Sequence, residues 1–291
     1  LTAVGLAALA PPNVCPTASL VAGFAEGIDN PSGSGDNAFG QGTKEDDPNV
    51  AIVDGSIPPN KNDLTRFYFG TELVGGANFL YLAWERAVNI GHANLDFEIN
   101  QNAQPFTATT TGHVTLSRTP GDILVTYDFP GSGTPNLGLL TWVTGPTTPT
   151  VPNFTTNTCF SANAFPCWGD RVDLTAAGFA EGAVNTGSVL DPITDPQGQN
   201  APRTLTTGLF GEAAINLTDA GVFPAGTCKA LGSAFVKSRS SSSFTAELKD
   251  FIAPIPVNIS NCGTIKIIKH TDPRGLNQAF AFTSSIPGAG N

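Results

Sequence analysis

Methionine is absent from this chain of 291 residues, and charged residues make up only 13% of it, about half of the usual share. Lysine and arginine together number 14, against 24 aspartates and glutamates, so the formal net charge is −10. Nucleic acid is therefore not an expected partner, because binding to phosphates needs a basic face. Apolar runs stay shorter than the roughly 18 residues of a spanning helix, so we expect no membrane span in this chain.

The motifs of common catalytic and cofactor sites are missing as well. The Gly131-Ser132-Gly133 string lacks the spacing of a nucleophile elbow, and neither a phosphate-binding loop nor a dinucleotide fingerprint occurs. The cysteines form no CxxC pair and no cluster with histidines, which argues against zinc. We therefore expect neither an enzymatic activity nor an organic cofactor.

Glycine (32) and proline (23) are abundant, and threonine, asparagine and serine are frequent. Gly and Pro interrupt helices, while Thr and Asn favour strands and turns. About a dozen short strands separated by turn signals predict an all-β fold, a jelly-roll-like β-sandwich with a few short helices. The helical pieces are predicted near Leu174–Glu181, Leu217–Phe223 and Thr245–Ile252. The strands are predicted at Ala18–Phe24, Ala51–Val53, Leu64–Tyr68, Phe79–Trp84, Asn94–Asn100, Val114–Leu116, Asp122–Phe129, Leu137–Val143, Ala213–Leu217 and Pro256–Ser260.

The clearest alternation lies in Asn94–Asn100, where Leu95 and Phe97 point one way and polar residues point the other. Asp96 and Glu98 share the polar face, and carboxylates at such a separation can hydrolyse a glycosidic bond. The interpretation that we favour is a polar sheet face or a set of cation ligands. A glycoside hydrolase is kept as a remote alternative.

Acidic residues gather in two turn-rich loops, residues 29–49 and 54–63. Ca²⁺ takes six to eight oxygens from carboxylates, amides and backbone carbonyls on flexible loops. The sequence therefore predicts a Ca²⁺ site in these loops, with a solvated acidic loop as the alternative. The expected ligands are Glu45, Asp46 and Asp47 first, and then Asp36, Asp54 and Asp63.

Five cysteines are present, which is an odd number. In an exported chain the natural pairing joins Cys159 to Cys167 and Cys228 to Cys262, although sequence alone does not fix the connectivity. Cys15 is left over, and it would be free, joined to another chain or lipid-modified.

The chain divides into three parts: an extended N-terminal segment (residues 1–17), a β-sandwich (18–262) and C-terminal strands (263–291). The start, LTAVGLAALAPP, resembles the end of a secretory signal. Export through a signal peptide is therefore expected, and we favour a retained, ordered segment over a cleaved one. After Cys262, GTIKIIKH and QAFAFT predict a β-hairpin, which is marginal on its own and needs a sheet to dock on.

Several strings resemble large surface proteins of actinobacteria: FGQGTKEDDP (39–48), DGSIPPNKNDL (54–64), FLYLAWER (79–86), NLDFEINQ (94–101) and FTAELKDFIAP (244–254). In those proteins a β domain precedes a prealbumin-like domain of the SpaA or Cna-B type. The segment GTIKIIKHTD of this chain resembles the opening strand of that second domain. The resemblance implies export, cell-surface display and a structural or adhesive role, and it supplies no reaction. Domains of that class often carry a Lys–Asn isopeptide bond. Lys266 or Lys269 would supply its lysine, but the later Asn strand is missing.

The leading hypothesis is an extracellular structural protein, a surface or filament subunit in which Leu1–Ala10 and Gly263–Thr283 donate strands to neighbouring copies. The second is an adhesin or carbohydrate-binding jelly roll that recognises a cell-wall or glycan surface. Its candidate platform is Tyr81, Trp84, Trp142 and Trp168, although we favour core packing for these aromatic residues.

Overall fold

The computed structural model describes residues 22–30, 33, 35–55, 60–89, 91–146, 158–191, 203–223, 228–262 and 270. These residues form antiparallel strands with one short α-helix and one 3₁₀ turn, so the predicted all-β fold is confirmed. Within these residues, no helix is long and apolar enough to cross a membrane. The predictions for residues 1–17, Cys15, Lys266, Lys269 and the C-terminal hairpin fall outside the described residues.

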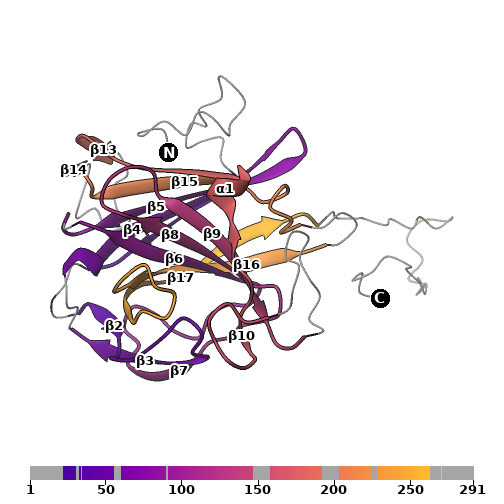
Figure 1. Cartoon of the computed structure of the whole chain (residues 1–291), viewed down its shortest axis with the longest axis horizontal. Coiled ribbons are helices and arrows are strands. Elements are labelled where there is room, and N and C mark those ends of the chain that lie inside the picture. The colour runs from indigo at the N-terminus through magenta and orange to yellow at the C-terminus, as the bar shows by residue number, and fades with distance from the viewer. Residues whose placement is uncertain are drawn as a thin grey trace.

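The first layer is a five-stranded sheet, in the order β1-β4-β5-β15-β12 (Figure 1). Its central strands β4 and β5 form a long hairpin, in which Phe67 pairs with Trp84 and Phe69 with Leu82. The apolar run predicted at Phe79–Trp84 lies inside β5. The strands of this sheet are β1 (Ala22–Ile28), β4 (Leu64–Val74), β5 (Ala77–Arg86), β12 (Ala180–Val184) and β15 (Phe210–Asn216).

The second layer is a ten-stranded sheet, in the order β10-β9-β8-β6-β16-β17-β2-β3-β7, with β11 also paired to β9. Its middle consists of long strands, and its two ends consist of short ones. These strands are β2 (Asn37–Phe39), β3 (Asn49–Asp54), β6 (Ala93–Asn100), β7 (Gly112–Thr115), β8 (Ile123–Phe129), β9 (Asn136–Val143), β10 (Cys167–Trp168), β11 (Val172–Asp173), β16 (Ala230–Arg239) and β17 (Leu248–Ser260).

The main core draws buried side chains from both sheets, which is the packing of a β-sandwich. Leu95, Phe97 and Ile99 of β6 all enter it, as the alternation predicted. Phe67 of the first sheet meets Phe97 of the second, with ring centroids 6.4 Å apart.

A second core lies on the other face of the large sheet. It joins side chains of β2, β3 and β7 to Phe235 of β16 and to Leu248 and Phe251 of β17. In Figure 1, β2, β3 and β7 lie beneath β16 and β17, on the side away from the five-stranded sheet. The large sheet is therefore covered on both faces in this region, and a polar residue on its outer face is not automatically exposed.

The predicted helices are mostly wrong. The helix expected at Thr245–Ile252 is wrong, because strand β17 begins at Leu248. Leu248 and Ile252 are buried in the cores on opposite faces of the large sheet, and Pro254 and Pro256 within the strand would break a helix. The stretch from Leu217 to Phe223 consists of turns and a bend.

Only part of the helix predicted at Leu174–Glu181 forms, as α1 (Leu174–Ala177). Asp173 caps its first turn and Gly178 ends it in a left-handed conformation. The sequence then continues as strand β12.

A two-stranded sheet, β13 (Val189–Asp191) with β14 (Arg203–Leu205), stands apart from the two layers. Arg66 of β4 attaches it through an ion pair of 2.9 Å to Asp191. The Tyr68 hydroxyl lies 2.9 Å from the same carboxylate. The remaining described element is the 3₁₀ turn η1 (Asn60–Asn62), just before β4.

Candidate functional site

A buried cluster of charges lies on the outer face of the large sheet, centred on Lys237 of β16. Its Nζ donates to Oε2 of Glu98 at 2.7 Å and also contacts the carboxylate of Glu45. The three side chains are completely buried. A charge buried this far from water is tolerated only when it is paired with an opposite charge or makes several hydrogen bonds. Glu45 must therefore stay next to Lys237, which fixes the position of the loop that carries Glu45.

Arg118 completes the cluster from the segment between β7 and β8. Its guanidinium donates two bonds of 2.8 Å to the two carboxylate oxygens of Glu98 and stacks over the Trp142 ring at 4.6 Å. Burial alone would raise the pKa of Glu98, but Arg118 and Lys237 together lower that pKa to about 2. The pKa of Glu45 is raised, because its burial outweighs the attraction of Lys237.

Arg239 occupies the neighbouring position on the same face of β16. It pairs with Asp96 of β6 and, at 2.8 Å, with Asp128 of β8. Its other nitrogen donates to the carbonyls of residues 241–243, which fixes the serine-rich loop. Asp96 and Glu98 are thus completely buried and paired with cations, instead of lying on a solvated sheet face. Glu98 does not have the raised pKa of a general acid in glycoside hydrolysis.

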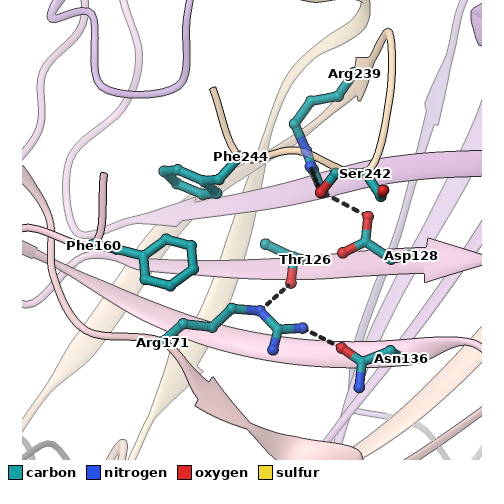
Figure 2. Close-up of a pocket in the computed structure, with 8 residues that line it drawn as sticks. All are labelled: Thr126, Asp128, Asn136, Phe160, Arg171, Arg239, Ser242 and Phe244. Atoms are coloured by element: carbon teal, nitrogen blue, oxygen red, sulfur yellow. Dashed lines mark hydrogen bonds and ion pairs between the residues drawn. The ribbon is translucent and has the colours of Figure 1, made fainter. Parts of the chain in front are cut away.

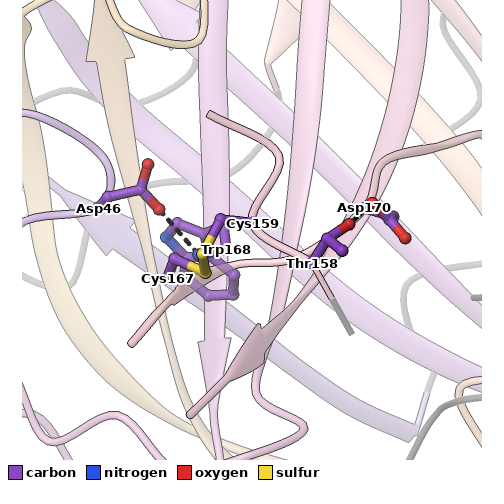
Figure 3. The surroundings of a disulfide bond; sticks show 6 residues. All are labelled: Asp46, Thr158, Cys159, Cys167, Trp168 and Asp170. Carbon is purple, nitrogen blue, oxygen red and sulfur yellow. Dashed lines mark hydrogen bonds between the residues drawn. A yellow bond between two sulfur atoms is a disulfide. The ribbon is translucent and has the colours of Figure 1, made fainter. Parts of the chain in front are cut away.

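The predicted calcium ligands divide into two groups in the structure. Glu45, Asp46 and Asp47 belong to the charge cluster and its surroundings. Asp46 accepts the Trp168 backbone N–H at 2.8 Å (Figure 3). Asp47 accepts the backbone N–H of Lys44 at 2.7 Å. Glu45 and Asp46 therefore hold residues 44–47 against the large sheet, while Asp47 closes a turn within the loop.

The second group, Asp36, Asp54 and Asp63, lies in or near a different carboxylate cluster. Of the residues of this cluster, only Asp36 was predicted as a ligand. Ligand atoms of Asp29, Asp36 and Asp250 lie within 4.8 Å of one another. We call these three residues the acidic triad. Asp63 and Asp54 are close enough to raise the pKa of Asp36 further, after burial, to about 7. Asp250 was missed, because the segment that contains it was predicted to be a helix far from these loops.

Two disulfides are present, Cys159–Cys167 and Cys228–Cys262, which is the pairing that the spacing favoured. The first closes a short loop beside Trp168 and holds it on the end of the large sheet (Figure 3). The second ties the start of β16 to the end of β17.

The disulfide loop also forms one wall of a small pocket of about 230 Å³. Phe160 lies in this loop, is 43% exposed and packs edge-on against Phe244 at 5.2 Å. Figure 2 shows the two rings on one side of the pocket and Asp128 and Asn136 on the other, with the Arg171 side chain reaching from below Phe160 toward Asn136.

The polar wall of the pocket is held in place by hydrogen bonds. The Arg171 guanidinium donates to the Thr126 hydroxyl at 3.3 Å and to the Asn136 amide oxygen. It lies directly over Gly138 of β9, where a Cβ would come within 2.1 Å of its Nε, so a side chain at this position would displace the guanidinium. The pocket thus combines an aromatic surface with an ordered set of donors and acceptors.

The aromatic residues predicted as a candidate sugar platform are buried. Tyr81, Trp84, Trp142 and Trp168 are at most 3% exposed, so core packing was the correct interpretation. The exposed ring at the pocket is that of Phe160, which was not among the predicted aromatic residues. Its place between two cysteines eight residues apart is the signal that could have identified it, because a short disulfide loop presents its side chains outward.

Comparison with known proteins gives no match: no family model, no curated protein and no solved structure corresponds to this chain. The likeness to actinobacterial surface proteins therefore remains a prediction from its sequence strings.

Proposed function

We propose that this chain is an extracellular structural module of a cell-surface or filament protein, and that it associates with further copies by strand addition at β1. The two disulfides support an oxidising, extracellular location. The observation that carries the proposal is the position of β1 at the end of the five-stranded sheet, where it leaves an edge.

The edge of β1 has the properties of a docking strand. Among the described strands, only β4 is hydrogen-bonded to β1, whose C-terminal part at Gly27 lies against Ile252 of β17. A strand at the edge of a sheet is a template for a further strand. Phe24 of β1 is 37% exposed and stacks at 6.2 Å on Tyr68. An added strand would cover this ring and satisfy the backbone groups, which is the recognition mode of β-strand addition.

The variant Phe24→Lys tests this assembly. A lysine on an edge strand opposes pairing with a second strand. We expect the wild-type protein to form concentration-dependent oligomers in sedimentation velocity. The variant should need at least a tenfold higher concentration to form the same fraction of oligomer, which corresponds to a loss of about 1.4 kcal/mol of association free energy.

The matched control is Phe160→Lys, because Phe160 is 43% exposed in the disulfide loop at the end of the large sheet, and β1 belongs to the other sheet. This control should assemble like the wild type. Equal association of all three proteins would refute strand addition at β1.

The second candidate function is adhesion through a glycan, and the pocket at Phe160 favours it. Sugar rings stack on exposed aromatic faces, and their hydroxyls pair with planar polar groups such as those of Asn136 and Arg171. The volume of the pocket suits one monosaccharide unit rather than a long chain.

Glycan-array binding followed by titration of the best hit tests this second function. Phe160→Ala should weaken binding about tenfold, the equivalent of 1.4 kcal/mol, while Phe24→Ala, which removes an exposed ring elsewhere, should leave it unchanged. No saturable binding to any glycan, or equal binding by both variants, would dismiss the pocket as a sugar site.

A further inference from the structure

The acidic triad brings together parts of the chain that are distant in sequence. Asp29 directly follows β1, Asp36 directly precedes β2, and Asp250 lies inside β17. Strand β1 belongs to the five-stranded sheet, while β2 and β17 are neighbours in the large sheet. The triad therefore lies where the two sheets meet. A ligand bound by all three carboxylates would link the five-stranded sheet to the large sheet.

The triad differs from the buried carboxylates of the charge clusters in its surroundings. Glu98, Asp96 and Glu85 each face an arginine or a lysine. No ion pair within the described part of the chain involves Asp29, Asp36 or Asp250. The charged neighbours that act on the triad are further carboxylates, Asp63 and Asp54, which add repulsion.

Asp36 supplies a second, independent observation. Its side chain is 0% exposed, and neither of its carboxylate oxygens has a hydrogen-bond partner. A buried carboxylate without a donor is costly. One of its oxygens lies within 4.8 Å of an oxygen of Asp29 and of Asp250, and the side chain is shielded from water, so the group is directed into the cluster.

The other two carboxylates are oriented by the backbone. Asp250 accepts the N–H of Leu64 at 2.6 Å through Oδ2 and that of Phe251 at 2.8 Å through Oδ1. Asp29 accepts the N–H of Asn30 at 2.9 Å through Oδ1, while its Oδ2 has no hydrogen-bond partner. Each carboxylate keeps lone pairs for a ligand, since an ionised carboxylate accepts about four hydrogen bonds.

The geometry points to a Ca²⁺ site formed by Asp29, Asp36 and Asp250, with Asp63 and Asp54 as the nearest further carboxylates. The donor set consists of oxygens alone, which suits a hard cation rather than zinc or copper. Ca²⁺ accepts irregular sets of six to eight oxygens, whereas Mg²⁺ demands a regular octahedron and retains water. The cation would replace the missing positive charge and join β1 to β2 and β17.

The test uses the full chain, stripped with EDTA and dialysed at pH 7.5, and titrated with CaCl₂ in a calorimeter. We expect one saturable site and a rise in Tm of about 5 °C or more in excess Ca²⁺. MgCl₂ and ZnCl₂ titrations serve as comparisons. Absence of stoichiometric Ca²⁺ binding, or tighter binding of Mg²⁺ or Zn²⁺, would overturn the assignment.

The variant Asp36→Asn locates the site. Asp36 is chosen because its carboxylate makes no hydrogen bond that the fold needs, whereas Asp250 holds two backbone N–H groups. We expect at least tenfold weaker Ca²⁺ binding.

The control Glu247→Gln removes one charge from a partly exposed pair with Lys249, and should bind as the wild type does. Wild-type affinity in Asp36→Asn would place the ion elsewhere. Since assembly at β1 is measured separately by sedimentation, failure of either idea leaves the other testable.

Discussion

Replacing Lys237 with methionine is expected to destabilise the protein by about 3–5 kcal/mol, the range for removing one partner of a buried ion pair. Methionine retains the length and apolar stem of lysine but removes the ion-pair partner of Glu45. Glu98 retains Arg118, so the loss is concentrated on Glu45 and on residues 44–47. Urea unfolding at pH 7.5, compared with wild type, measures it.

Two further variants make this prediction specific. Lys249→Met removes a lysine from a partly exposed pair with Glu247 and should cost less than about 1 kcal/mol. Adding Glu45→Gln to Lys237→Met should restore part of the stability, because the uncompensated charge is gone. A loss in Lys237→Met no larger than in Lys249→Met would show that the buried cluster has no structural role.

The metal-free protein is expected to lose stability as the pH rises from 5 to 8. Burial, followed by neighbouring carboxylates, raises the pKa of Asp36 to about 7 and that of Asp29 to about 8, from an ordinary value of 3.8. The folded state therefore binds more protons than the unfolded state in this window, so stability falls with increasing pH. For Asp36 alone, about two pH units at 1.36 kcal/mol each give on the order of 3 kcal/mol.

Urea unfolding in EDTA at several pH values checks this dependence, and Asp36→Asn isolates the contribution of Asp36 from other groups. Glu85 also has a pKa of about 7, again mainly through burial, so the wild type alone would not suffice. The variant should show a shallower decline. Excess Ca²⁺ should reverse the trend in the wild type, because protons then compete with the ion. A metal-free stability that stays constant or rises toward pH 8 would contradict the assignment of the triad as an unneutralised cluster.

The sequence predicted the apolar half of the fold better than the polar half. The alternation in β6 correctly predicted that Leu95 and Phe97 share one face, which is buried in the core between the sheets. It could not show that β2, β3 and β7 cover the opposite face, because that depends on contacts between segments far apart in the chain. Asp96 and Glu98 were expected on a polar sheet face or as cation ligands, and they are in fact buried in ion pairs with lysine and arginine side chains.

Strand β16 escaped prediction, although its residues alternate as clearly as those of β6. Ala234 and Val236 enter the main core, while Phe235, Lys237 and Arg239 line the other face. A lysine and an arginine two residues apart suggest a solvated edge, because charges are rarely buried. Their carboxylate partners, on β6, β8 and the Glu45 loop, are what make the burial tolerable, and no local pattern reveals them.

The calcium prediction shows the same limit. Asp36, Asp54 and Asp63 lie in or near one cluster as expected. Glu45 instead pairs with Lys237, which is 192 residues away in the sequence. Asp250 lies in the acidic triad, although its strand β17 was predicted to begin as a helix. Acidic loops can be recognised in a sequence, but which carboxylates meet a cation of the protein and which meet one another depends on the sheet topology.

Strand addition is tested most directly by negative-stain microscopy of the oxidised 291-residue chain at high concentration, compared with a variant that lacks residues 1–12. If the chain is an extracellular structural module that assembles by strand addition, the wild type forms elongated head-to-tail assemblies. The shortened variant, which loses apolar residues preceding β1, forms fewer of them or none. Single particles of monomer size in both samples would contradict the proposal.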